Sequence, residues 1–119
     1  MRLDHVQLAI PRGSEPLCRA FYCELLGWRE MEKPPNLAAR GGLWLDVGEG
    51  QVHLGVEDDF RPARKAHPAL LVTDLDALAT RLQAAGAAIS LDDAIPGVRR
   101  FYAHDPVGNR LEFIEDRVS

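Results

Sequence analysis

A short pattern that occurs twice, 62 residues apart, constrains the fold of this 119-residue chain more than any other feature of its sequence. The segment His5-Val6-Gln7-Leu8-Ala9-Ile10 is matched by His67-Pro68-Ala69-Leu70-Leu71-Val72. Each copy begins with a histidine, has the apolar alternation of a strand, and precedes an amphipathic helical segment. Two modules this small cannot each close a hydrophobic core, so we expect them to share one.

The same order of elements is predicted after each copy. In the first half, Ser14 is expected to cap a helix that ends at Gly27, and segments 28–32, 43–47 and 51–57 alternate as strands do. In the second half, Asp74 is expected to cap a helix that ends at Gly86, before strands at 87–91, 98–103 and 110–115. The apolar stripes of the two helices are Leu17, Ala20, Phe21 and Leu25, and Leu75, Leu78, Ala79, Leu82 and Ala85.

This order predicts an α+β fold in which two β-α-β-β-β modules pair into a curved sheet with a central metal cavity. Module one covers residues 1–58, a polar connector covers 59–66, and module two covers 67–119. We expect the whole chain, 1–119, to form a single domain.

Four metal-binding side chains are predicted on the faces of the strands that the helices leave open. Strand residues alternate between the two faces of a sheet, and the apolar set of each strand belongs under the helix. This assignment leaves His5, His53, His67 and Glu112 on the open faces at corresponding positions of the two modules. Imidazole nitrogens and a carboxylate are ordinary ligands of a borderline divalent ion, so we predict one such ion, with zinc, nickel, cobalt, manganese and iron all possible.

The seventh and third strands supply candidate substrate-binding residues. Arg100 is expected to anchor a substrate carboxylate, and Tyr102 is expected to be catalytic by donating a hydrogen bond to a metal-bound oxygen. Trp44 is expected to wall the pocket, and Gln7 to orient a ligand. The alternatives are that Arg100 is a solvated edge charge, Trp44 an interface aromatic and Gln7 an ordinary polar strand residue.

Composition excludes several partners. A net charge of -4 and a pI near 5.5 give no basic field for a phosphate backbone, so nucleic acid is not expected. The sequence has no apolar run long enough to span a membrane, and its first residues have no continuous apolar segment. We therefore expect a cytoplasmic protein whose partner is a small molecule.

The sequence resembles the vicinal oxygen chelate superfamily, which includes glyoxalase I, extradiol dioxygenases, fosfomycin-resistance enzymes and bleomycin-resistance proteins. The resemblance covers nearly the whole chain and rests on His5-Val6-Gln7-Leu8, Phe21-Tyr22-Cys23-Glu24-Leu25-Leu26-Gly27-Trp28, His67 before Ala69-Leu70-Leu71-Val72, and Asp105-Pro106-Val107-Gly108-Asn109-Arg110-Leu111-Glu112-Phe113. Ligands of this superfamily lie on the first, fourth, fifth and eighth strands, which corresponds to His5, His53, His67 and Glu112 here.

The resemblance implies a metal-dependent, glyoxalase-like lyase or isomerase that acts on a small molecule with vicinal oxygens, with Glu112 as the proton-transfer base. The fourth-strand ligand of glyoxalase I is typically a carboxylate, whereas this chain has His53. The alternatives are a non-catalytic small-molecule or antibiotic-binding protein and an Fe(II) extradiol-type dioxygenase.

The resemblance also implies a homodimer, because pairing half-barrels between chains leaves fewer open sheet edges. In the version that resembles glyoxalase I, His5 and His53 come from one chain and His67 and Glu112 from the other.

Overall fold

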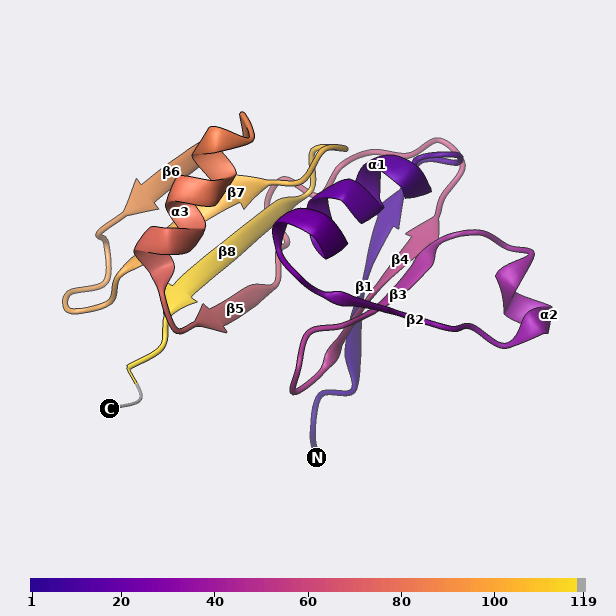
Figure 1. Ribbon diagram of the computed structural model, residues 1–119, viewed down its shortest axis with the longest axis horizontal. Coiled ribbons are helices and arrows are strands. Elements are labelled where there is room, and N and C mark those ends of the chain that lie inside the picture. Colours follow the sequence, from indigo (N-terminus) through magenta and orange to yellow (C-terminus); the bar gives the residue numbers. More distant parts are fainter. Residues whose placement is uncertain (118–119) are drawn as a thin grey trace. The chain divides into compact units, whose positions relative to one another are not determined.

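The computed structural model describes residues 1–117 and divides the chain into two compact units, Met1–Ala63 and the segment from Arg64 onward. The fold is α+β, and each unit contains a four-stranded mixed sheet that is open rather than closed into a barrel (Figure 1). The predicted element order is therefore confirmed. The pairing of the two sheets into one curved sheet around a metal stays a prediction.

In the first unit, the first strand lies at one edge of the sheet and pairs in parallel with the last strand. The elements in chain order are β1 (His5–Ile10), α1 (Glu15–Arg19), the π-helix η1 (Ala20–Leu25), β2 (Arg29–Met31), α2 (Pro35–Ala38), β3 (Leu43–Asp46) and β4 (Gln51–Val56). The sheet order is β1-β4-β3-β2, in which β1 and β4 are parallel and the other pairs antiparallel. Strands β1 and β4 therefore lie side by side, although about 40 residues of chain separate them.

The second unit repeats this arrangement. Its elements are β5 (Ala69–Val72), α3 (Leu75–Ala84), β6 (Ile89–Asp92), β7 (Arg100–His104) and β8 (Arg110–Glu115). The sheet order is β5-β8-β7-β6, and the parallel pair is again the first strand with the last. Helix α3 lies across one face of this sheet (Figure 1), and the Asp74 side chain caps it by accepting a hydrogen bond from Ala77 N.

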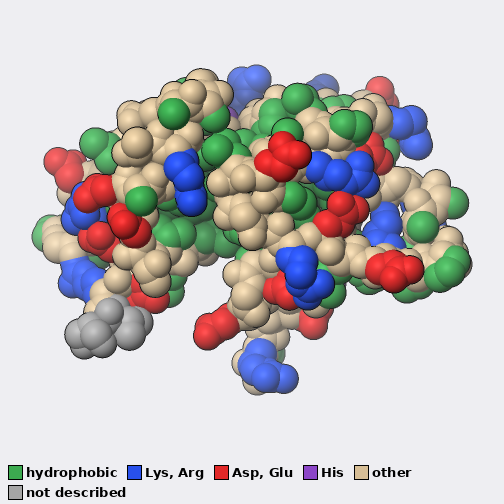
Figure 2. Space-filling model, in the orientation of Figure 1, with side chains coloured by type: hydrophobic (Ala, Val, Ile, Leu, Met, Phe, Trp, Pro, Cys, Tyr) green, Lys and Arg blue, Asp and Glu red, His purple; other side chains and the backbone are tan. Residues whose placement is uncertain are grey.

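Each core lies between a helix and one face of its sheet. The strand residues predicted to face the helices include the most buried side chains of the chain, among them Leu8, Ile10, Leu54, Phe101, Leu111 and Phe113. Their burial leaves the alternate residues of the same strands on the open faces. On the molecular face shown in Figure 2, acidic and basic side chains are interspersed. Among residues 1–117, no helix is long and apolar enough to cross a membrane.

The first helix differs from its prediction. It changes from α to π geometry at Ala20, which shifts the buried stripe to Cys18, Phe21 and Tyr22 and leaves Leu17 exposed. The Ser14 hydroxyl does not cap the helix but donates to Pro11 O at 2.6 Å. The short helix α2 is a second difference, because only a loop was predicted over these residues.

Candidate metal-binding residues and pockets

The predicted ligands occupy equivalent positions in the two units. In the parallel pair of the first unit, Gln7 is the register partner of His53, and His5 lies two residues before Gln7. In the second unit, Ala69 is the register partner of Glu112, and His67 lies two residues before Ala69. Each unit therefore provides one histidine at the start of its first strand or two residues before it, and one further donor on its last strand.

An aromatic side chain flanks the last-strand donor in both units. Trp44 of β3 is the register partner of His53, and Tyr102 of β7 is the register partner of Glu112. Cross-strand partners have their side chains on the same face, so both aromatic residues share the open face with the donors. The predicted placement of Trp44 and Tyr102 beside the ligands is consistent with this register.

In the first unit the donors form a stack of rings. The imidazoles of His5 and His53 have centroids 3.9 Å apart and an angle of 13° between their planes, and Trp44 covers the other side of His53 at 4.6 Å. His5 Nδ1 lies 2.8 Å from Asp4 Oδ2, which can only accept, so Nδ1 carries the hydrogen in this contact. A neutral His5 is thereby left with an Nε2 lone pair for a ligand.

His53 is held more tightly than His5. It is buried, and its Nε2 lies 2.8 Å from Gln51 Oε1. Burial lowers the pKa of the His53 imidazole, and the charges of His5 and Lys33 lower it further. The ring is therefore neutral at pH 7, which is the form that binds a metal.

In the second unit the donors form a charged cluster instead. His67 Nε2 lies 2.9 Å from Glu112 Oε1, and His67 Nδ1 lies 2.7 Å from the carbonyl oxygen of Lys65. Arg100 donates through Nη1 to Glu112 Oε2 at 2.9 Å and through Nη2 to Asp92 at 3.0 Å. Glu112 is therefore paired at both carboxylate oxygens.

The surroundings of Glu112 keep it ionised. Burial acts to raise the pKa of this carboxyl, but the hydrogen bonds from Arg100 and His67 outweigh it, and the pKa lies below its ordinary value. Glu112 is therefore a carboxylate at neutral pH. This is the form required both to bind a cation and to accept a proton.

Tyr102 is enclosed by cationic and aromatic groups. The Arg110 guanidinium lies 3.7 Å from the centroid of the Tyr102 ring, and His67 meets the same ring edge-on at 5.3 Å. The Tyr102 hydroxyl accepts a hydrogen bond from Arg100 Nη1 at 3.1 Å, so its own hydrogen remains available to another oxygen.

The donor chemistry in each unit fits a divalent ion, although neither unit holds a complete site. Among residues 1–117, no group of three or more His, Cys, Asp or Glu side chains is close enough to hold a metal ion. Each unit offers two donors, and both ring nitrogens of His67 face acceptor oxygens. A neutral imidazole has only one N–H, so the contact between Nε2 and Glu112 requires a second proton or a cation.

A pocket of about 640 Å³ lies over the open face of the first unit. His5, Gln7, Trp44 and His53 line it, and its use by a substrate stays a prediction. Its remaining walls come from the connection between β2 and β3 and from the far end of β4: Asp4, Lys33, Leu37, Arg40, Gly41, Gln51, Leu54, Gly55 and Val56.

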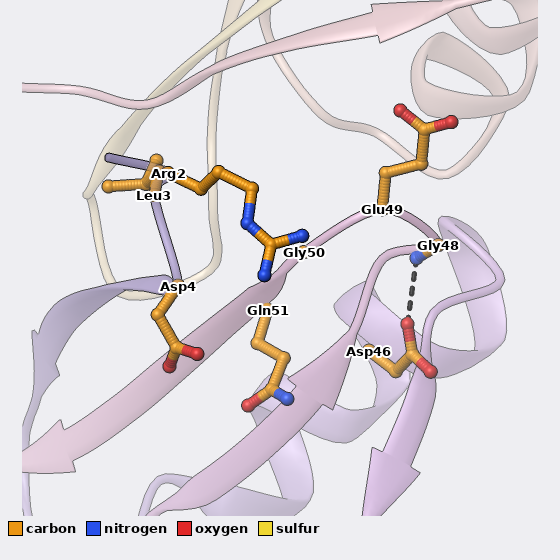
Figure 3. Close-up of a pocket in the computed structure, with 8 residues that line it drawn as sticks. All are labelled: Arg2, Leu3, Asp4, Asp46, Gly48, Glu49, Gly50 and Gln51. Atoms are coloured by element: carbon orange, nitrogen blue, oxygen red, sulfur yellow. Dashed lines mark hydrogen bonds between the residues drawn. The ribbon is translucent and has the colours of Figure 1, made fainter.

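A second pocket, of about 660 Å³, is formed by the segment before β1 and the turn between β3 and β4 (Figure 3). Figure 3 shows the Asp46 carboxylate accepting from Gly48 N at 2.8 Å in that turn. Asp4 and Gln51, the partners of His5 and His53, line both pockets. The two pockets are therefore neighbours that share Asp4 and Gln51, and the histidine pair lines the first of them.

The sequence did not single out the groups that orient the predicted ligands. Asp4 and Gln51 contact His5 and His53, and Asp92 holds Arg100 in place. Gln51 has a recognisable signal, because it precedes His53 by two residues on one strand and so shares its face. Asp92 has no such signal, because its role depends on the pairing of β6 with β7.

Comparisons with known proteins agree with this fold. Residues 15–114 match the family described as the glyoxalase-like domain. A Bacillus anthracis protein assigned to the glyoxalase family is 45% identical, covers 98% of this chain and 96% of its own, and superposes with a TM-score of 0.94.

More distant solved structures share the fold. Lactoylglutathione lyase from Agrobacterium tumefaciens is 19% identical, with a TM-score of 0.74 and coverage of 96% of this chain and 92% of that chain. An antibiotic-binding protein from a Streptomyces species is 25% identical, with a TM-score of 0.69 and coverage of 97% and 98%. Among curated proteins, none matches this chain. On these observations the chain belongs to the glyoxalase-like family of the vicinal oxygen chelate superfamily.

Proposed function

We propose that this protein is a metal-dependent, glyoxalase-like lyase or isomerase that acts on a small molecule with vicinal oxygens. His5, His53, His67 and Glu112 hold one divalent ion. The observation that carries the proposal is the matched register, in which the parallel strand pairs of the two units present one histidine and one further donor at equivalent positions. Isolated polar strand residues would have no reason to share this register.

A divalent ion held by these residues would supply Lewis-acid chemistry to the adjacent oxygens of the substrate. The side chains around it supply orientation and proton transfer. Arg100 binds one oxygen of Glu112 and leaves Oε1 directed at His67, so the carboxylate is presented through a single oxygen. Asp4 and the Lys65 carbonyl fix the hydrogens of His5 and His67 on Nδ1.

Proton transfer is assigned to Glu112, because it is the only carboxylate among the four proposed ligands. Tyr102 lies beside it and has its hydroxyl hydrogen available to a substrate oxygen. Gln7 and Trp44 contact the substrate from the first unit, where both line the pocket. Arg100 orients Glu112 in addition to its proposed contact with a substrate carboxylate.

A non-catalytic binding protein is the second candidate. The 25% identity to an antibiotic-binding protein and the aromatic wall that Trp44 gives to an open pocket favour it. The two candidates differ in turnover. They also differ in metal content, which should be measured on protein purified without a chelator, and bound iron with oxygen consumption on catechols would instead indicate a dioxygenase.

Thermal unfolding with and without a divalent metal tests the metal site. A metal at about 100 times its dissociation constant should stabilise the wild type by roughly 2.7 kcal/mol. The melting shift should be largely lost in His5→Ala and His67→Ala, and retained in the control His104→Ala, whose histidine is exposed at the end of β7. Equal shifts in all four proteins would remove His5 and His67 from the site.

A mixing experiment tests whether a homodimer shares its sites between chains. His5→Ala and Glu112→Ala are each expected to be inactive alone. If His5 and His53 come from one chain and His67 and Glu112 from its partner, mixed dimers regain some intact sites and part of the activity. A mixture that remains inactive after subunit exchange would refute the shared site.

A further inference from the structure

The strand register divides the floor of the pocket over the first unit into two successive rows of residues. Trp44, His53 and Gln7 are aligned across β3, β4 and β1. Two residues further along β4 lies Gly55, whose partner on β1 is Ala9. A strand advances about 3.3 Å per residue, so this second row lies roughly 6–7 Å beyond the His53 row.

Two cations stand at the far end of this pocket. Lys33 donates through Nζ to the carbonyl oxygens of Gly41 and Gly42. Gly42 packs so closely on β4 that an added Cβ would lie 2.1 Å from Leu54 O and 3.5 Å from Gly55 Cα. The Lys33 ammonium is therefore fixed at the Gly55 row, and it has a third N–H in addition to the two that these carbonyls accept.

Arg40, the second cation, follows α2 in the same connection and lines the same pocket. Within residues 1–117, its guanidinium has no hydrogen bond or ion pair, and Lys33 has no carboxylate partner. The connection that carries both is anchored, because Glu15 Oε2 accepts a hydrogen bond from Gly42 N at 2.9 Å. Two cations that make no ion pair are thus held on one wall, and the Glu15 carboxylate is the nearby opposite charge of Lys33.

The neighbouring pocket has more acidic side chains in its lining. The pocket in Figure 3 is lined by three carboxylates, Asp4, Asp46 and Glu49, with Arg2 as its cation. The pocket that contains Lys33 and Arg40 has only Asp4 as a carboxylate, and that group contacts His5. An anion that reaches the histidine pair is therefore favoured on the Lys33 side.

The Gln7 amide packs against β4 at the second row because residue 55 is glycine. An added Cβ at Gly55 would lie 2.7 Å from Gln7 Nε2, so the Gln7 amide lies over the position that a larger residue would fill. The Gln7 side chain therefore extends from the His53 row toward the Gly55 row. Trp44 and Leu37 line the same pocket with apolar surface.

We propose that the first unit contains a carboxylate subsite formed by Lys33 and Arg40, and that the substrate is a short compound with vicinal oxygens at one end and an anionic group at the other. The inference rests on the proposed metal-dependent function for the placement of the vicinal oxygens. The separation of the rows sets the spacing at roughly 6–7 Å, which about four or five bonds span. Gln7 contacts the middle of such a compound.

Two six-carbon keto acids test this subsite, because they share the same chelating end. 2-Oxoadipate has a distal carboxylate and 2-oxohexanoate has a methyl group in its place. Binding of each is measured by calorimetry to the full-length, zinc-loaded protein, and zinc binding is titrated on the same preparations. The wild type should bind 2-oxoadipate at least about 10-fold more tightly, as expected for charge-assisted hydrogen bonds to a carboxylate.

Variants of Lys33 and Arg40 test whether the preference for 2-oxoadipate comes from these two cations. Arg40→Gln and Lys33→Gln should each reduce it several-fold, and the double variant should abolish it. Arg61→Gln removes an exposed cation of the same unit outside the pocket and should retain it. Arg40→Gln is decisive if Lys33→Gln disturbs the connection, because the described residues offer the Arg40 guanidinium no hydrogen bond or ion pair that the substitution would remove.

The outcomes separate the two proposals. Zinc binding without a preference for 2-oxoadipate, or a preference that persists in the double variant, would overturn the carboxylate subsite alone. A wild type that binds no zinc or any other divalent metal would overturn the proposed function, and the subsite's role in it as well.

Discussion

The two units place their proposed ligands at the same strand positions but surround them with opposite electrostatics. In the first unit, His53 is a neutral ring stacked between His5 and Trp44. In the second, Glu112 at the matching position is a carboxylate held by Arg100 and His67. A duplicated backbone can therefore keep the position of a donor while its charge changes, provided that the neighbouring strand supplies a suitable partner.

The side chains next to these two donors differ in the same way. Trp44 occupies in β3 the place that Tyr102 occupies in β7, and it buries a neutral imidazole without a counter-charge. Beside Glu112, the cationic partner Arg100 prevents an uncompensated buried charge. This difference predicts that the second unit is more sensitive to the loss of a single side chain.

The largest effect is expected from Arg100→Met. The Arg100 and Glu112 side chains are 11% and 7% exposed, so removing the guanidinium leaves a buried carboxylate with one partner fewer. Loss of one member of such a pair should lower the free energy of unfolding by about 4 kcal/mol, whereas His53→Leu in the first unit should cost about 1 kcal/mol or less. Chemical denaturation measures both.

Arg100→Met combined with Glu112→Gln should recover much of the loss, because the buried charge is then absent. Additive losses in the double variant would show that Arg100 stabilises the unit by packing alone.

The second-largest effect is expected on turnover, and it should differ between Glu112 and His53, the donors on the last strands of the two units. Glu112→Gln retains a carbonyl oxygen that can bind a metal weakly but cannot accept a proton at neutral pH. Activity per bound metal should fall about 100-fold, as expected for the loss of a general base. His53→Gln should lower metal occupancy while activity per bound metal changes little.

Both quantities are measured on the same samples, by metal analysis and by turnover of the vicinal-oxygen substrate. Unchanged activity per metal in Glu112→Gln would end the base assignment and direct attention to Tyr102.

A smaller effect distinguishes the loops that precede β3 and β7. Gly42 has a φ of +85°, and an added Cβ would clash with the Leu54 carbonyl at 2.1 Å, whereas a Cβ at Gly97 would meet only the end of the Arg117 side chain at 3.1 Å. Gly42→Ala should therefore destabilise by about 2 kcal/mol or more, and Gly97→Ala by about 1 kcal/mol. Equal melting temperatures for the two variants would contradict this reading of the loops.

The repeat and the strand alternation were sufficient to predict the element order, and they assign each proposed ligand to a face of its sheet. Period-two patterns specify which residues are buried, and Leu54, Phe101 and Phe113 are buried as predicted. The π-geometry after Arg19 was not predictable, because a stripe such as Leu17 to Leu25 fits a continuous α-helix equally well. The cations of the pocket were missed because Lys33 and Arg40 lie in a connection without periodicity.

The smallest effect concerns the anchoring of that connection by Glu15 and its dependence on pH. The backbone hydrogen bond from Gly42 lowers the pKa of the Glu15 carboxyl below its ordinary value near 4.5, with smaller contributions from the charges of Arg19 and Lys33. The unfolded chain therefore binds this proton at a higher pH than the folded chain does. The stability that the carboxylate contributes is present above about pH 4.5 and is lost as the pH falls through the lower, folded-state pKa.

Glu15→Gln should be about 1 kcal/mol less stable than the wild type at pH 7, and this difference in the free energy of unfolding should narrow between pH 5 and pH 3 in denaturant titrations. A gap that does not change with pH would contradict the role of the ionised carboxylate. An equal, equally pH-dependent gap in Glu24→Gln, which removes an exposed carboxylate from η1, would assign the effect to net charge rather than to the Gly42 hydrogen bond.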